Sequence, residues 1–367
     1  MNIQTIETGY ASIPLHTPFK TALRTVTTVE TIVVKVTCDN GVIGWGEAPP
    51  TEVITGDSVA SIVEAINTMI KPLLCGQSLL QREHVFAALS SSAVGNTSAK
   101  AAVDMALHDC LAQYAGMPLF QFLGGYRSVI ETDDTVSVNH PGEMADDAQA
   151  CINDGFTTLK VKVGRDDSQT DIKRIEAIRE QVGPDPLIRL DANQGWQAKE
   201  AVRTIQKMET LGLDIQCVEQ PVVRHDLDGL RYVTAHTSPL IVADESVFSA
   251  YDAKRVLEAR AVDMINIKLM KTGGIHEALK VATLADIYGV ACMVGSMMET
   301  GMGITAAAHV AASQPNVTWY DLDAPLMLDG DTIDGGIEYN ASHITFGNRP
   351  GLGITGLNER VIQWHQD

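Results

Sequence analysis

From about residue 130 onward, the sequence repeats one pattern: a short apolar stretch, a polar turn and an amphipathic helical stretch. The apolar stretches end near charged or polar residues that follow one another at intervals of 24 to 29 residues: Lys162, Asp191, Glu219, Asp244, Lys268, Ser296 and Asp321. One strand–helix–strand unit takes about 30 residues. The repetition therefore predicts a parallel (β/α)8-type barrel, whereas a doubly wound sheet fits less well because the series has no topological break.

Eight strands are predicted in this region, at residues 135–138, 158–163, 187–192, 215–220, 240–245, 264–269, 291–296 and 317–323. Side chains along a strand alternate between its two faces, so Val242 and Asp244 share one face, as do Asn266 and Lys268. In parallel barrels the catalytic residues lie at the carboxyl ends of the strands. We therefore expect the charged strand ends to meet at the mouth of the barrel.

The first 125 residues follow a different pattern. Residues 31–48 read as two strands joined at Asp39-Asn40-Gly41, which is a hairpin signal, and helical patterns follow at about 58–74, 79–91 and 97–116. The predicted organisation has three parts: an α+β domain (1–125), the barrel (126–340) and a C-terminal segment that returns to the N-terminal strands (341–367).

The charge and composition of the chain limit its partners. The formal net charge of −19 argues against binding to nucleic acid and to anionic membranes, both of which favour basic proteins. No apolar run reaches the about 18 to 20 residues that span a bilayer, and the first residues lack a signal-peptide pattern. The six cysteines are scattered, as is usual in a reducing compartment. We expect a cytoplasmic homo-oligomer with a small-molecule substrate.

Three consecutive predicted strands end in a carboxylate: Asp191, Glu219 and Asp244. Converging carboxylates without a counter-ion repel one another, and some would become protonated. A hard divalent cation that takes oxygen ligands, of which Mg²⁺ is the best match, removes this conflict. The alternative is that each acid caps the following helix or pairs with a lysine, which explains a single acid more readily than three at matched positions.

Lysines flank the three carboxylates in strand order, with Lys162 one strand before them and Lys268 one strand after. In a closed barrel, they would face each other across the mouth. Two bases on opposite sides of one carbon suit a 1,1-proton transfer, and a metal-bound carboxylate acidifies that carbon by stabilising an enediolate. A neighbouring cation such as Lys160 lowers the pKa of a lysine base. The alternative for either lysine is a salt bridge to the carboxylates.

The segment GMGITA (301–306) resembles a dinucleotide fingerprint, with Asp321 twenty residues after Gly301. It belongs to the seventh unit of a uniform series, however, and not to the first turn of a Rossmann half. The glycines fit a strand–helix loop or an anion site at a helix N-terminus better than NAD.

Five segments together resemble the enolase superfamily, muconate-lactonizing-enzyme subgroup: KVK (160–162), DANQGW (191–196), VEQP (218–221), ADES (243–246) and NIKLMKTGG (266–274). The resemblance covers essentially the whole chain. It implies a modified TIM barrel with an N-terminal α+β capping domain that the C-terminal segment completes. These motifs do not separate epimerases from cycloisomerases, o-succinylbenzoate synthases or N-acylamino-acid racemases.

Three further segments narrow the resemblance to the L-Ala-D/L-Glu dipeptide epimerases: FKTALRT (19–25), ITGDS (54–58) and DLDAP (321–325). The resemblance implies that Asp321 and Asp323 bind the amine of the dipeptide and that Arg24 pairs with the glutamate side chain. It also places substrate contacts at four positions: Thr135, Lys160, Ser296 and Met298. The alternatives are a solvated Arg24 and an acidic pair that caps the next helix.

Taken with this resemblance, the sequence predicts a Mg²⁺-dependent epimerase of L-Ala-D/L-Glu that uses murein peptides. A racemase of N-acylamino acids or a cycloisomerase remains as an alternative, although its substrate lacks a free amine. A Schiff-base lyase that uses a barrel lysine is a mechanistically different alternative. A binding protein on a barrel scaffold is the non-enzymatic one, and it gives no reason for opposed lysines around three carboxylates.

Overall fold

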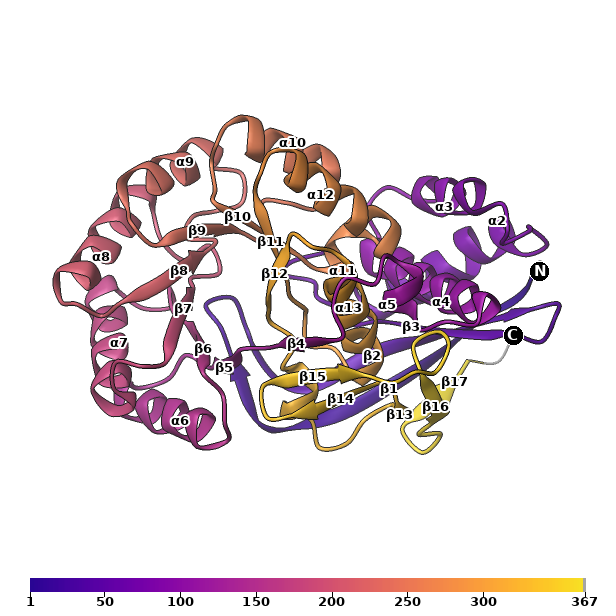
Figure 1. Cartoon of the computed structure of the whole chain (residues 1–367), viewed down its shortest axis with the longest axis horizontal. Coiled ribbons are helices and arrows are strands. Elements are labelled where there is room, and N and C mark those ends of the chain that lie inside the picture. Colours follow the sequence, from indigo (N-terminus) through magenta and orange to yellow (C-terminus); the bar gives the residue numbers. More distant parts are fainter. Residues whose placement is uncertain (366–367) are drawn as a thin grey trace.

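An eight-stranded parallel sheet forms the centre of the computed structural model, which describes residues 1–365. The strands lie side by side in chain order: β5 (Asp134–Val136), β6 (Thr158–Lys162), β7 (Leu187–Asp191), β8 (Ile215–Glu219), β9 (Leu240–Ala243), β10 (Met264–Ile267), β11 (Ala291–Val294) and β12 (Val317–Tyr320). Figure 1 shows them curling into an arc. All eight predicted strands are therefore confirmed, each within a few residues of its expected bounds.

Helices follow the first seven strands and cover the outside of the arc (Figure 1): α6 (Pro141–Asn153), α7 (Ser168–Val182), α8 (Ala198–Thr210), α9 (Leu227–His236), α10 (Ala250–Glu258), α11 (Leu269–Thr272) with α12 (Ile275–Ile287), and α13 (Gly301–Ser313). The eighth strand is followed by a 3₁₀ turn, η2 (Ala324–Met327). The backbone N–H of Asp133, just before β5, donates to the carbonyl of Tyr320 at the end of β12, at 3.2 Å. This contact joins the two ends of the strand order.

The two faces of the barrel strands have different surroundings. Ile188 and Ile265, on the outer face, are fully buried in the main core with the helices. On the inner face, a separate apolar cluster of Cys217, Val242 and Met264 fills the interior below the mouth. The interior is therefore a packed core, and most of the inward charged residues lie at the carboxyl ends of the strands.

The N-terminal domain is an antiparallel sheet covered by helices. Its strands are β1 (Ile3–Lys20), β2 (Thr25–Cys38) and β3 (Ile43–Ala48), with the predicted hairpin between β2 and β3. Its helices are α1 (Val59–Glu64), η1 (Ala65–Ile70), α2 (Lys71–Leu74), α3 (Arg82–Ser91), α4 (Thr97–Ala115) and α5 (Leu119–Phe122). The stretch predicted as one helix at 58–74 passes through a π turn, η1. Pro72 accounts for it, because proline has no N–H and its ring crowds the carbonyl four residues earlier.

The C-terminal segment contacts both parts of the molecule. Five short strands follow η2, and the last three lie in this segment: β13 (Ile333–Gly335), β14 (Ile337–Asn340), β15 (His343–Phe346), β16 (Ile354–Leu357) and β17 (Ile362–Trp364). β15 pairs with β4 (Val129–Glu131), and β17 pairs antiparallel with β1. Among the residues that the structure describes, no helix is both long and apolar enough to cross a membrane.

Candidate active site

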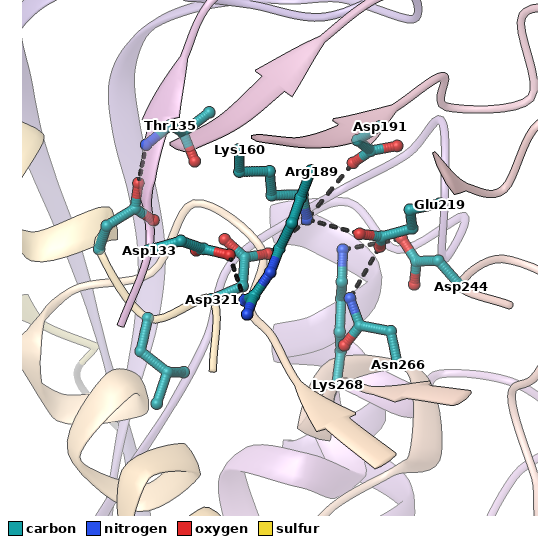
Figure 2. A network of polar contacts seen from close by, with 12 residues as sticks. Asp133, Thr135, Lys160, Arg189, Asp191, Glu219, Asp244, Asn266, Lys268 and Asp321 are labelled. Carbon is teal, nitrogen blue, oxygen red and sulfur yellow. Dashed lines mark hydrogen bonds and ion pairs between the residues drawn. The ribbon is translucent and has the colours of Figure 1, made fainter. Parts of the chain in front are cut away.

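The strand ends bring the predicted charged residues together at one end of the barrel. Lys162 and Asp191 are register partners on β6 and β7, and Asp191 and Glu219 are partners on β7 and β8. Asp244 and Lys268 directly follow β9 and β10. All five side chains are buried. Parallel pairing aligns the carboxyl ends of the strands, and this places residues far apart in sequence in one charged layer (Figure 2).

Each of the three carboxylates contacts a lysine. Lys162 Nζ lies 2.7 Å from Asp191 Oδ2, Lys160 Nζ lies 2.8 Å from Glu219 Oε2, and Lys268 Nζ lies 2.8 Å from Asp244 Oδ2. The salt bridges that the sequence left as an alternative are therefore present. Burial favours the neutral form of Lys268, but the nearby carboxylates, Asp244 first and then Glu219 and Asp321, together outweigh it and raise the pKa of that lysine. Asp244 in turn has a lowered pKa, because its lysine neighbours outweigh its burial.

Within residues 1–365, no three side chains of the His, Cys, Asp and Glu types are gathered closely enough to hold a metal ion, because ammonium groups lie among the carboxylates (Figure 2). The donor set still fits a hard divalent cation. Glu245, next to Asp244, is 2% exposed, and neither of its carboxylate oxygens has a hydrogen-bond partner. A buried acceptor left unpaired costs about 1–3 kcal/mol, more when charged. This surplus of buried, unpaired oxygen beside three strand-end carboxylates is what a bound cation would satisfy.

A cleft lies over this charged layer, between the N-terminal domain and the barrel mouth. The N-terminal domain contributes the loop between β1 and β2, including Arg24, and residues 53–54. The barrel side includes most of the predicted contacts: Thr135, Lys162, Lys268, Ser296, Met298, Asp321 and Asp323. The other predicted residues are buried and do not line the cleft: Lys160, Asp191, Glu219 and Asp244.

Arg24 offers a free cation to this cleft. Within the described part of the chain, its guanidinium has no hydrogen bond and no ion pair, although the residue is only partly exposed. Burial lowers the pKa of Arg24, and the attraction of Glu52 opposes this effect. A partly desolvated guanidinium with no partner is suited to a carboxylate, which it can bind through two parallel hydrogen bonds.

The two predicted acidic residues, Asp321 and Asp323, have different surroundings. Asp321 Oδ2 lies 2.5 Å from Lys160 Nζ and is neutralised by it. Asp323 accepts a hydrogen bond from the backbone N–H of Thr135 at 2.7 Å, and no cation pairs with it among the residues described. Burial, together with Asp321, raises the pKa of Asp323 to about 7. Asp323 precedes η2 without capping it through its side chain, which removes the capping alternative for this residue.

Sequence reasoning missed an ion pair below the mouth. Arg189 Nη1 lies 3.0 Å from Asp133 Oδ2 (Figure 2). The guanidinium of Arg189 also stacks 4.1 Å above the ring of Trp319. Arg189 is two residues before Asp191 and therefore points to the same, inner face of the strand, so its direction could be predicted from the sequence. Asp133, by contrast, precedes its strand, and nothing in the local pattern marks it.

Lys271 and Asn266 each contact one of the strand-end carboxylates. Lys271 Nζ lies 2.6 Å from Asp244 Oδ1 and donates to the carbonyl of Asn266 at 2.9 Å. Asn266 Nδ2 donates to Glu219 Oε1 at 2.7 Å. The spacing offers a signal for both residues: Asn266 shares a strand face with Lys268, and Lys271 follows Lys268 by one helical turn in α11.

Two family models match the chain. The model of the "Mandelate racemase / muconate lactonizing enzyme, N-terminal domain" matches residues 4–124, and the "Enolase C-terminal domain-like" model matches residues 143–360. The chain belongs to the enolase superfamily. The resemblance read from its strand-end motifs is thus confirmed.

Relatives in the enolase superfamily are similar to this chain over nearly its full length. An L-Ala-D/L-Glu epimerase of Bacillus subtilis is 56% identical over 97% of both chains. A hydrophobic dipeptide epimerase of Enterococcus faecalis is 41% identical, over 97% of this chain and 100% of the relative.

Solved structures of the superfamily have the same fold. The substrate-liganded complex of the L-Ala-D/L-Glu epimerase from Bacillus subtilis has a TM-score of 0.97, with 97% of this chain and 99% of that chain covered at 56% identity. The Enterococcus faecalis dipeptide epimerase complexed with Mg and L-Leu-L-Tyr has a TM-score of 0.94 at 41% identity, with 97% and 100% covered.

Proposed function

We propose that this protein is a Mg²⁺-dependent dipeptide epimerase that inverts the α-carbon of the C-terminal residue in L-Ala-L-Glu and L-Ala-D-Glu. One observation carries the proposal: a single cleft has an unpaired guanidinium, an unpaired acid and two lysines on its walls, namely Arg24, Asp323, Lys162 and Lys268. The named activities of the Bacillus subtilis and Enterococcus faecalis relatives support it.

The cleft orients the substrate through its charges. Asp323, which lacks a cation, takes the free ammonium group of the first residue. Arg24 takes the side-chain carboxylate of the second residue, for which a planar guanidinium is the matching partner. Thr135, Ser296 and Met298 line the rest of the space that the dipeptide occupies. An acylated amine carries no positive charge, so such a substrate would leave the buried Asp323 without a cation. An N-acylamino-acid racemase is therefore the weaker assignment.

Asp191, Glu219 and Asp244 would hold one Mg²⁺ ion. When bound, the ion draws charge from the substrate α-carboxylate and stabilises the enediolate that forms as the α-proton leaves. Mg²⁺-bound structures of dipeptide epimerases from Enterococcus faecalis and Cytophaga hutchinsonii support this cofactor. Glu245 adds two buried, unpaired oxygens beside the site, and burial together with Asp244 raises its pKa to about 8.

Lys162 and Lys268 exchange the proton. Three strands, β7, β8 and β9, separate their strands in the sheet order, so the two ammonium groups reach the cleft from different sides. One lysine removes the α-proton as a neutral amine, and the other donates a proton to the opposite face of the carbon. Before the proton transfer, each lysine must separate from its carboxylate partner, Lys162 from Asp191 and Lys268 from Asp244. Lys160 remains charged between Glu219 and Asp321, and its positive charge favours the neutral form of a neighbouring lysine.

The lysine environment disfavours the Schiff-base alternative. An amine that attacks a carbonyl must be neutral, and enzymes achieve this by desolvation without a carboxylate partner. Lys160 is buried, yet its carboxylate neighbours Asp321 and Glu219 raise its pKa, so it keeps the proton that a Schiff-base nucleophile must lose.

We also propose a cytoplasmic role in the use of murein peptides, in which L-Ala and D-Glu are adjacent. The six free cysteines of the described residues support a reducing compartment.

Arg24→Met tests the substrate assignment. We expect kcat/KM for L-Ala-L-Glu to fall about 10- to 100-fold, because a hydrogen bond to a charged group contributes about 1.5–3 kcal/mol and each 1.4 kcal/mol is a factor of ten. Methionine keeps an unbranched apolar stem but has no guanidinium. The measurement is the initial rate of L-Ala-D-Glu formation, followed by chiral chromatography after hydrolysis.

L-Ala-L-Leu is the matched control substrate, since it has no side-chain carboxylate. We expect its kcat/KM to change less than about threefold in Arg24→Met. An equal loss for both dipeptides would show that Arg24 supports the loop and does not read the substrate. Failure of the wild-type protein to epimerise any L-Ala-X dipeptide in the presence of Mg²⁺ would overturn the proposed function.

A further inference from the structure

Glu47 reaches from the N-terminal domain to a helix of the barrel. It lies near the end of β3 and is completely buried. Its carboxylate accepts hydrogen bonds from the N–H groups of Thr300 at 2.8 Å and Gly303 at 2.9 Å, and from the Thr300 hydroxyl at 2.6 Å. These donors belong to the first turn of α13 and its N-cap residue. A carboxylate is favourable at this position because the N-terminal N–H groups of a helix carry partial positive charge.

The contact fixes one end of the substrate loop. Residues 295–300 connect β11 to α13, and Thr300 is the last of them. Ser296 and Met298, two residues of this loop, line the cleft. Met298 also packs with Ile13 and Val29 of the N-terminal sheet. The loop is therefore attached to the N-terminal domain both at its end, through Glu47, and at its centre, through Met298.

The glycines of GMGITA make room for the protein's own carboxylates. A Cβ atom built on Gly303 would lie 2.5 Å from Glu47 Oε1 and 2.3 Å from Glu299 Oε2. One built on Gly301 would lie 2.2 Å from Asp331 Oδ2, which with Oδ1 accepts from the Gly301 N–H. In this segment, as in a nucleotide-binding loop, glycines let an anionic group approach the backbone closely. Here the anionic groups are carboxylates of the protein itself.

We propose that Glu47 is a positioning residue for substrate binding, which holds loop 295–300 so that Ser296 and Met298 fit the first residue of the dipeptide. The proposal rests on the proposed function for its substrate, but the contact itself does not depend on it. Glu47 touches neither the substrate cleft nor the lysines, so it acts through the loop. Loss of the contact should weaken binding and leave the proton-transfer step nearly unchanged.

A second contact between the domains provides a matched control. Asp104 on α4 is also buried, and it accepts from the N–H groups of Ile275 at 2.6 Å and His276 at 3.3 Å. It thereby holds the first turn of α12, as Glu47 holds that of α13. None of these three residues lines the cleft. Asp104→Ala removes a comparable interdomain contact without touching loop 295–300.

The test compares Glu47→Ala, Asp104→Ala and the conservative Glu47→Gln in the full chain with Mg²⁺. We expect Glu47→Ala to raise KM for L-Ala-L-Glu about tenfold with kcat changed less than about threefold, and to reduce the preference for L-Ala-L-Glu over L-Leu-L-Glu. Glu47→Gln keeps an oxygen for the two N–H donors and should restore most of the binding. Asp104→Ala should leave KM within twofold of the wild-type value.

Hydrogen exchange of the same variants tests the inference independently of catalysis. We expect the amides of residues 296–303 to exchange at least about tenfold faster in Glu47→Ala and to remain unchanged in Asp104→Ala. If Glu47→Ala does not fold, Thr300→Val, which keeps both backbone N–H donors but removes the hydroxyl that contacts Glu47, the Met302 N–H and Thr332, should shift both readouts in the same direction by about threefold. Unchanged KM and exchange, or equal changes in the Asp104 variant, would overturn the positioning role. Loss of wild-type turnover would instead count against the proposed function.

Discussion

Replacing Lys162 by alanine is expected to lower kcat for L-Ala-L-Glu and for L-Ala-D-Glu by roughly 10²- to 10⁴-fold, the usual contribution of a general base. Both directions fail because one lysine must remove the proton while the other supplies one. Lys162 Nζ is at the cleft wall, 2.7 Å from Asp191 Oδ2, so its loss removes the base and leaves the carboxylate in place. The measurement is kcat from each diastereomer, followed by optical rotation.

Lys199→Ala is the matched control, because this lysine is exposed on α8 and away from the cleft. We expect it to have wild-type kcat. We also expect Lys162→Ala to keep solvent exchange of the α-proton in one diastereomer only, through the remaining Lys268, and Lys268→Ala to show the complementary pattern. Turnover of Lys162→Ala within about tenfold of the wild-type rate would exclude the two-base mechanism.

Removal of divalent metal is expected to reduce epimerisation by at least about 10³-fold, with recovery on addition of Mg²⁺. The charged layer explains the size of the effect. Without a divalent ion, Asp191 and Asp244 remain paired with Lys162 and Lys268, and neither amine is free to reach the α-proton. The measurement is the initial rate after EDTA treatment and after titration with MgCl₂.

A readout without turnover distinguishes loss of the ion from loss of the fold. Saturation with Mg²⁺ at about 100 times Kd should stabilise the folded protein by about 2.7 kcal/mol, seen as a rise in Tm. Glu219→Gln should lose most of this rise, whereas Glu258→Gln on α10, which is exposed, should keep it. Activity that persists in EDTA, together with trapping of substrate by borohydride, would favour the Schiff-base alternative.

The parts of the site that follow from strand periodicity could be predicted from the sequence. A strand alternates its faces and a parallel sheet aligns its carboxyl ends, so Asp191, Glu219 and Asp244 could be assigned to one layer before any contact was known. The missing helix after the eighth strand was harder to foresee. There, Pro325 in the first turn of η2 and the inward Asp323 replace the amphipathic repeat of the earlier units.

Contacts between distant segments left no local signal. Glu47 and Thr300 are 253 residues apart, and the pattern around each is that of an ordinary strand end and loop. Asp133 and Arg189 likewise meet only inside the barrel, because β6 lies between β5, which Asp133 precedes, and β7, which carries Arg189. The pairing of each lysine with a particular carboxylate depends on side-chain torsions beyond the direction set by the strand, so the sequence could supply the members of the site but not their partners.

The most direct test of the central claim is the position of deuterium after reaction in D₂O. L-Ala-L-Glu is incubated with the protein and Mg²⁺ in D₂O, and the α-protons of both residues are followed by NMR. Two-base epimerisation predicts that L-Ala-D-Glu forms with deuterium at the glutamate α-carbon and that the alanine α-proton remains. Deuterium at the alanine α-carbon, or inversion of glutamate without deuterium, would contradict the account.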